Sequence, residues 1–264
     1  MLVDKPKQAI LALLGRLGYT LVKNGADVDS GTPYHQDGLL SCHNHDFVDE
    51  PAFKTAYRRG LAAVQGIDPH NHWRLHVALW AAEVAMRVPG DFVECGVNAG
   101  FMSSALMEYF DWNSSGRSFY LVDSFEGPPP DQLTETEAQS GLHEQTREAI
   151  ERGAYVTDME RITANFEEWH NAVIVKGIIP QVLPRVPARE IALLHLDMNA
   201  AHPEREALAF FWPLISPGGV VLLDDYAYYG YGQQKAAIDS LADKLGFATL
   251  SLPTGQGLVV KQGA

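Results

Sequence analysis

Three features of the sequence predict an α/β fold with a mostly parallel, seven-stranded sheet flanked by helices. From residue 91 onward, short β-branched or apolar runs alternate with longer amphipathic segments, as in parallel strands joined by helices. One such run leads directly into a glycine-containing turn and then a helix. The chain has 264 residues and is 46% hydrophobic, which suits one large α/β domain better than two domains of ordinary size.

Seven short apolar runs are the expected strands. Their length and β-branched content favour strands over helices. A turn with the sequence Ser-Pro-Gly-Gly, over residues 216–219, leads into the fifth of them. The expected strands cover residues 92–97, 119–122, 172–175, 191–196, 220–223, 247–250 and 258–260.

Five longer amphipathic segments between these strands are the expected helices. Pro203 suits a first helical position, and Gly246 suits a C-terminal stop. The expected helices cover residues 101–110, 144–152, 158–169, 203–212 and 233–245.

Residues 1–90 differ from the rest and predict a helical cap or oligomerisation segment ahead of a catalytic domain at 91–264. Helices are expected at 6–17, 51–63 and 73–87, with a polar stretch at 24–49. The third helix has apolar residues at helical spacing, so its expected role is to pack onto the sheet. These residues are Leu75, Leu79, Ala82 and Met86.

The composition restricts the partners and the compartment. The formal net charge is -13 and no block of basic residues interrupts it, so we expect no nucleic-acid partner. The N-terminal apolar run is broken by Gly15 and Arg16, so neither a signal peptide nor a membrane span is expected. Cys42 and Cys95 are expected to be reduced thiols in a cytoplasmic protein, which we also expect to be a homo-oligomer.

A glycine turn after the first expected strand predicts a nucleoside site. Gly96 and Gly100 stand in the pattern E-x-G-x-x-x-G, where residues without Cβ let the backbone approach a ligand. The pattern lacks the G-x-G-x-x-G of diphosphate-binding turns, which favours a nucleoside without a diphosphate. Asp123 ends the next strand, where a carboxylate can accept hydrogen bonds from ribose hydroxyls. The alternative is a tight turn alone, with Asp123 as a helix cap.

Three aspartates at the ends of two further strands predict a divalent-cation site. Asp197 follows the fourth strand, and Asp224 and Asp225 follow the fifth, so parallel pairing would bring them to one crevice. A hard cation such as Mg²⁺ accepts oxygen ligands and would orient and acidify a substrate hydroxyl. The alternative is that Asp224 begins a turn, Asp225 caps the following segment and Asp197 touches only the cofactor.

From about residue 89 to its end, the chain resembles the macrocin O-methyltransferase family of Rossmann-like class I methyltransferases. The resemblance rests on V-E-C-G-V-N-A-G, L-V-D-S-F-E-G, L-H-L-D and S-P-G-G-V-V-L-L-D-D-Y. It implies S-adenosylmethionine and a divalent metal as cofactors, and a sugar hydroxyl of a glycosylated natural product as methyl acceptor. It implies cofactor contacts by Glu94, Gly96, Asn98, Gly100, Asp123 and Ser124, and metal contacts by Asp197, Asp224 and Asp225.

The chain departs from the family pattern after Asp197. The family has D-G-D-x-Y-E-S-T there, whereas residues 197–204 read D-M-N-A-A-H-P-E, so the identity of the acceptor is left open. The resemblance also implies a histidine base on a segment after the second strand, where His143 is the only histidine. His195 and His202 are the alternatives for the base.

The sequence thus predicts a metal-assisted O-methyltransferase of a small hydroxylated molecule, with His143 and Asp197 as catalytic residues. Two other functions remain open. A nucleoside-binding protein without catalysis is compatible with the altered segment after Asp197. A nicotinamide-dependent oxidoreductase is disfavoured by the absent G-x-G-x-x-G.

Overall fold

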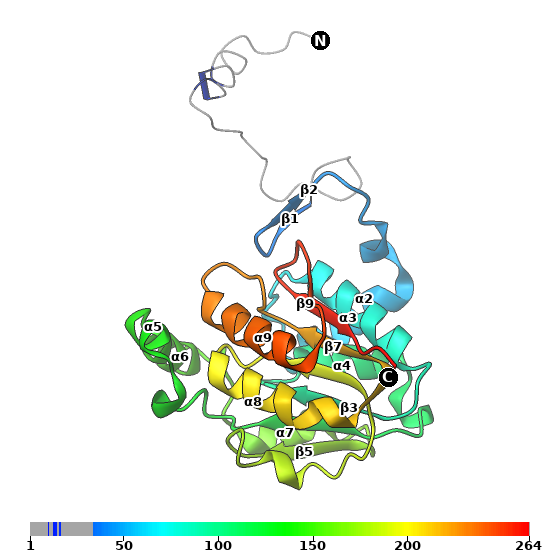
Figure 1. The fold of residues 1–264 in the computed structure, drawn as a ribbon. Helices are drawn as coiled ribbons and strands as arrows, with labels where there is room; N and C mark the ends of the chain where they lie inside the picture. Colours follow the sequence, from blue (N-terminus) through cyan, green and yellow to red (C-terminus); the bar gives the residue numbers. More distant parts are fainter. Residues whose placement is uncertain (1–9, 11–12, 15, 17–33, 264) are drawn as a thin grey trace. The chain divides into compact units, whose positions relative to one another are not determined.

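The computed structural model describes residues 10, 13–14, 16 and 34–263 (Figure 1). Contacts within the chain divide it into two units, Met1–Asp46 and Phe47–Ala264. The helix expected at 6–17 lies largely outside the described residues.

A seven-stranded sheet forms the centre of the larger unit, in the order β5-β4-β3-β6-β7-β9-β8. The first five strands in this order are parallel, and β9 and β8 are antiparallel to their neighbours, which confirms the predicted fold class. The strands are β3 (Asp91–Cys95), β4 (Phe119–Asp123), β5 (Ala172–Lys176), β6 (Ile191–Leu196), β7 (Ile215–Leu223), β8 (Leu250–Ser251) and β9 (Gly257–Val260).

Two of the expected strands differ from those observed. β7 begins at Ile215, so residues 216–219 form an irregularity inside the strand, where its pairing with β6 shifts register, and not a turn before it. β8 is only two residues long and starts three residues later than expected. Gly246 ends the preceding helix with a φ of 74°, and the Phe247 ring packs on Trp212 at 4.4 Å between centroids, so residue 247 does not join the sheet.

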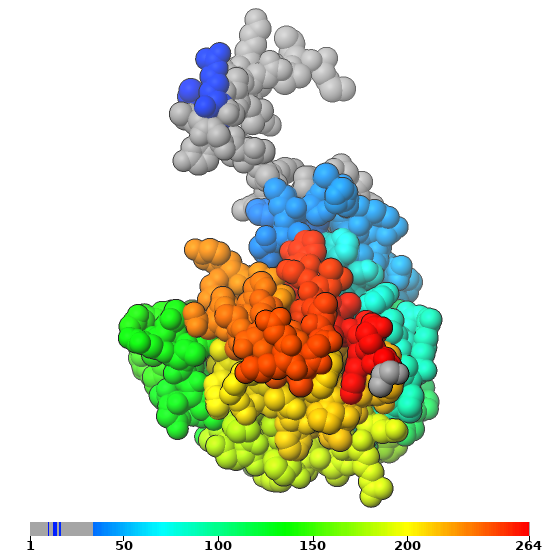
Figure 2. Space-filling view, viewed as in Figure 1, coloured from blue at the N-terminus to red at the C-terminus, as the bar shows by residue number. Residues whose placement is uncertain are grey.

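The helices of the larger unit match the expected segments within a few residues, and one was not predicted. The additional helix, α5 (Glu135–Gln139), begins with a capping box in which Thr134 and Glu137 bond each other's backbone N–H groups. α5 and α6 project together from the side of the unit (Figure 2). The predicted helices are α2 (Pro51–Ala63), α3 (His72–Ala85), α4 (Phe101–Tyr109), α6 (Leu142–Glu151), α7 (Met159–Phe166), α8 (Ala201–Phe211) and α9 (Gly232–Leu245).

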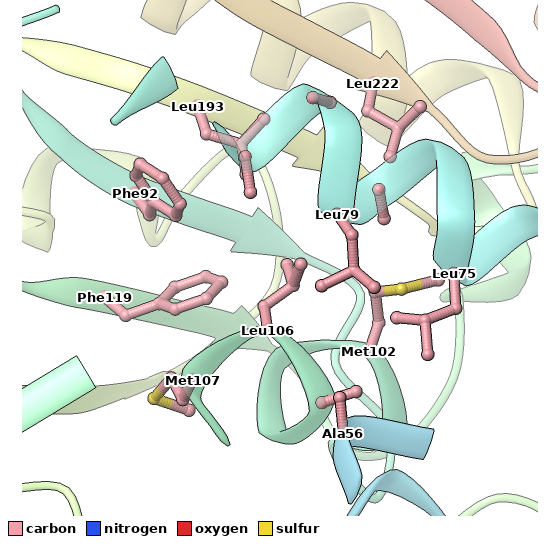
Figure 3. Close-up of a cluster of buried hydrophobic side chains, with 14 of the residues drawn as sticks. Ala56, Leu75, Leu79, Phe92, Met102, Leu106, Met107, Phe119, Leu193 and Leu222 are labelled. Carbon is pink, nitrogen blue, oxygen red and sulfur yellow. The ribbon is translucent and has the colours of Figure 1, made fainter. Parts of the chain in front are cut away.

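Alternation along the strands divides the apolar core between the two faces of the sheet. Phe92 of β3 belongs to one buried cluster and its neighbour Val93 to the other. The first cluster includes Leu75 and Leu79 of α3 and Leu106 of α4, which meet the sheet residues in Figure 3. The expected packing of α3 onto the sheet is therefore confirmed.

The division of the chain at residue 90 stays a prediction, and the contacts within the chain group the residues at a different point. α2 and α3 belong to the compact unit with the sheet, because their apolar faces are buried in its core. The smaller unit contains a hairpin of β1 (Tyr34–Gln36) and β2 (Leu39–Ser41), which lies within the stretch expected only to be polar. Asp37 and Gly38 join its strands with φ angles of 49° and 72°, as a two-residue type I′ turn requires.

Within the described ranges, every helix is too short or too polar to cross a membrane. Cys42 and Cys95 are both free thiols, the first exposed and the second buried. An oligomerisation role for residues 1–90 stays a prediction.

Candidate functional site

A pocket with about 820 Å³ of open space lies at the carboxyl ends of β3, β4 and β6. Parallel strands end at the same edge of a sheet, so residues far apart in the sequence meet there. Five predicted site residues line this pocket: Gly96, Asn98, Asp123, Ser124 and Asp197.

The carboxylate of Asp123 holds the glycine turn in place. One of its oxygens accepts hydrogen bonds from the backbone N–H groups of Val97 at 2.6 Å and Asn98 at 2.9 Å. The other accepts one from Phe125 N–H at 2.7 Å. A carboxylate offers about four acceptor positions, so three are used within the protein and capacity remains for one ribose hydroxyl.

The turn itself needs residues that tolerate a left-handed backbone. Gly96 has a φ of 87°, and a Cβ there would lie 1.8 Å from the carbonyl oxygen of Asp197. Asn98 has a φ of 51°. Its side-chain amide donates to the Ala154 carbonyl and accepts from Val156 N–H, both at 2.9 Å. Asn98 thereby holds the segment after α6 beside the pocket.

Two predicted cofactor residues lie outside the pocket lining. Glu94 is 2% exposed, and its Oε1 is 3.0 Å from Nδ1 of His195, so its side chain takes part in a buried polar network. Gly100 has a φ of 87°, and a Cβ there would lie 2.3 Å from Cζ of Phe166. The requirement for glycine at residue 100 thus comes from its left-handed backbone and from packing against α7. A cofactor contact by Glu94 or Gly100 stays a prediction.

The two aspartates at the end of β7 are paired with an arginine. Nη1 of Arg74, on α3, donates to Oδ2 of Asp224 and lies 3.2 Å from Oδ1 of Asp225. Nε2 of Gln256 donates to the other oxygen of Asp224 at 2.8 Å. All four residues are buried.

This arrangement does not fit the predicted Mg²⁺ site. A guanidinium group already lies between two of the three expected carboxylate ligands. Among the residues that the structure describes, no group of three or more His, Cys, Asp or Glu side chains is arranged to hold a metal ion.

Burial and neighbouring charges shift the pKa values of this cluster in opposite directions. Burial, and then the charges of Asp224 and Asp225, raise the pKa of Asp197 well above its usual range. Burial also acts to raise the pKa of Asp224, but the charge of Arg74 and the contact with His195 outweigh it and lower that pKa. For His195, burial lowers the pKa, but Asp224 and Glu94 reverse the effect and raise it to about 10. These two carboxylates therefore favour the protonated form of His195.

The histidine predicted as the base does not line the pocket. His143 is exposed near the start of α6. His195 is 1% exposed and held between Glu94 and Asp224, and His202 is partly buried on α8. Asp197 is the predicted catalytic residue that does line the pocket, and the role of His143 stays a prediction.

Sequence reasoning missed two residues of the site, Arg74 and Tyr155. Arg74 lies on α3 at helical spacing with Ala78, Ala81 and Ala85, which are fully buried. A basic residue on an otherwise apolar helix face indicates that an acidic group is buried beside it. Tyr155 lines the pocket in the segment that Asn98 holds, and nothing in its local sequence marks it.

The fold is that of the class I methyltransferases. The structure of the O-methyltransferase NovP matches this chain with a TM-score of 0.61 and 22% sequence identity, over 72% of this chain and 80% of that one. The sequence model of the macrocin O-methyltransferase (TylF) family matches residues 74–244, more than half of the chain. The chain belongs to this family.

Two curated relatives carry more specific names. The chain is 33% identical over 149 residues to 8-demethyl-8-(2,3-dimethoxy-alpha-L-rhamnosyl)-tetracenomycin-C 4'-O-methyltransferase of Streptomyces olivaceus, covering 53% of this chain and 54% of the relative. It is 27% identical over 161 residues to mycinamicin III 3''-O-methyltransferase of Micromonospora griseorubida, covering 58% and 62%. The matched region thus spans little more than half the length of these relatives.

Proposed function

We propose that the chain transfers a methyl group from S-adenosylmethionine to a hydroxyl oxygen of a sugar in a glycosylated natural product. The observation that carries this proposal is the meeting of Gly96, Asp123 and Asp197 in one pocket at the carboxyl edge of the sheet. Membership of the macrocin O-methyltransferase family, and the names of the two relatives, support transfer to oxygen and the class of acceptor.

The pocket suits the nucleoside part of the cofactor. Asp123 has one acceptor position left for a ribose hydroxyl, while its other positions keep the glycine turn in shape. Apolar residues such as Val122, Ile178 and Ile179 also line the pocket and offer a surface for an adenine ring. When bound, S-adenosylmethionine supplies an electrophilic methyl group.

The acceptor hydroxyl must lose a proton as its oxygen attacks, and Asp197 is the group we assign to receive it. Asp197 lines the pocket at the end of β6. Burial and the charges of Asp224 and Asp225 raise its pKa, which increases its affinity for a proton. The nearby Tyr155, whose pKa is raised by burial and by Asp197, stays protonated and is a hydrogen-bond donor in the same pocket.

The experiment that tests the proposal measures binding and transfer separately. Calorimetry should show binding of S-adenosylhomocysteine but not of NAD, and labelled S-adenosylmethionine should methylate rhamnosylated natural products but not their aglycones. Asp197→Asn should lower the transfer rate by roughly 100-fold or more. Asp243→Asn, on the exposed face of α9, is the matched control and should leave the rate unchanged.

Each outcome separates the alternatives. Binding of S-adenosylhomocysteine without transfer to any glycoside would favour a nucleoside-binding protein, in line with the altered sequence after Asp197. Binding of NAD would favour the oxidoreductase. If His143→Ala and not Asp197→Asn abolished transfer, the base would be His143.

A further inference from the structure

A built-in cation joins the two carboxylates at the end of β7. Nη1 of Arg74 donates to Oδ2 of Asp224, lies 3.2 Å from Oδ1 of Asp225, and is 3.3 Å from the Asp224 backbone carbonyl. Two adjacent carboxylates repel each other, and a positive group between them removes that repulsion. A divalent metal would do the same in this place.

The position of Arg74 is fixed by the fold. The residue is 7% exposed, and its helix packs against β7 and β6 through the core. Its Cζ lies 4.4 Å from the centre of the Tyr228 ring, a cation–π contact that holds the guanidinium plane. Arg74 is therefore buried and held at its guanidinium group, unlike a surface side chain that a metal could displace at little cost.

The second oxygen of Asp224 is also engaged. Oδ1 accepts a hydrogen bond from Nε2 of Gln256 at 2.8 Å, and Nε2 of His195 lies 3.7 Å from it. Mg²⁺ requires near-octahedral oxygen donors at about 2.0–2.1 Å. To bind it, Asp224 would have to lose contacts with Arg74 and Gln256 while both partners stayed buried.

The residues around Asp197, the third expected metal ligand, differ from the family pattern. Asn199 stands two residues after Asp197, where the family pattern has a second aspartate, and its Nδ2 lies 3.4 Å from Oδ1 of Asp197. This replaces a negative group by a neutral donor. The change lowers the negative charge that would attract a metal ion.

We propose that Arg74 is the resident cation of this site and replaces the divalent metal, so that the chain neither binds nor needs one. Arg74 acts through Asp224 and Asp225 and is thus a positioning residue. The inference rests on the proposed function for its catalytic consequence, but metal binding can be measured without any acceptor.

The test is a titration with Mn²⁺, followed by electron paramagnetic resonance, on the full chain without substrate. The wild type should leave millimolar Mn²⁺ free, and its melting temperature should not change with Mg²⁺ or EDTA. Arg74→Ala, which removes the guanidinium group from both carboxylates, should bind Mn²⁺ at least about tenfold more tightly than the wild type. Arg87→Ala, whose exposed side chain follows the same helix, is the matched control and should behave as the wild type.

Rescue distinguishes this role from a merely structural one. The Arg74→Ala variant should lose thermal stability, and Mg²⁺ but not NaCl of equal ionic strength should restore part of it. If Arg74→Ala does not fold, the wild-type titration still decides. Stoichiometric Mn²⁺ binding by the wild type, or loss of its transferase activity in EDTA, would overturn the inference, whereas absence of transfer with no metal binding would count only against the proposed function.

Discussion

Replacement of Asp123 by asparagine should weaken both the fold and cofactor binding. The carboxylate accepts three backbone hydrogen bonds, from Val97, Asn98 and Phe125. Asparagine has one acceptor oxygen, so whichever way it turns, its NH₂ group faces at least one of these N–H donors. An unsatisfied donor of this kind costs about 1–3 kcal/mol. Because Asp123 is only partly buried, we expect a loss of about 2 kcal/mol in the free energy of unfolding.

The assay combines urea denaturation with calorimetric titration of S-adenosylhomocysteine. A loss of this size corresponds to a decrease of roughly 4–8 °C in melting temperature. The displaced turn should also lower the affinity for S-adenosylhomocysteine by about tenfold or more. Asp131→Asn is the matched control, because Asp131 is exposed and does not line the pocket. An Asp123→Asn variant that matched the control in both stability and affinity would refute this account of the turn.

Two further predictions concern Gly100 and Glu204. Gly100→Ala should lose about 2–4 kcal/mol of stability from backbone strain and a clash with Phe166. Gly116→Ala, at a similar φ but with open space around it, should lose only about 1–2 kcal/mol. Equal losses for the two variants in urea denaturation would contradict the packing role of Gly100. Burial and the charge of Asp225 raise the pKa of Glu204 from 4.5 to about 8. The folded state therefore binds more protons than the unfolded state between these values, so Glu204 should make stability fall as pH rises across that window. Glu204→Gln should remove that part of the slope, and identical slopes for variant and wild type in urea denaturation at several pH values would refute the shift.

The parallel sheet could be predicted because each of its strands is a short apolar run between amphipathic segments. The predicted elements differ from the observed ones where the composition of a segment and its tertiary contacts favour different structures. The Ser-Pro-Gly-Gly segment has the composition of a turn, yet it continues β7 because Lys261 donates its backbone N–H to Gly219 and accepts one from Gly218. The hairpin at Asp37-Gly38 and the capping box at Thr134 were signals present in the sequence but not used.

The pocket residues could be predicted for a different reason, which is topological. Once the strands are parallel, the residues that follow them must share one edge, so Asp123 and Asp197 were placed without knowledge of any side-chain contact. Arg74 could not be placed in this way. It lies 150 residues before Asp224, and only the packing of α3 on the sheet brings the two together.

The contribution of α3 to the acidic cluster bears on the predicted division of the chain at residue 90. Residues 1–90 and 91–264 suggested a cap beside a complete catalytic domain. In the structure, α3 supplies core side chains and also Arg74, the cation that holds Asp224 and Asp225 together. A chain starting at residue 91 would therefore expose apolar surface and leave two buried carboxylates without their arginine partner. The match to the family model also begins at residue 74. The segment that completes the site therefore starts at α3, ahead of the first strand of the sheet.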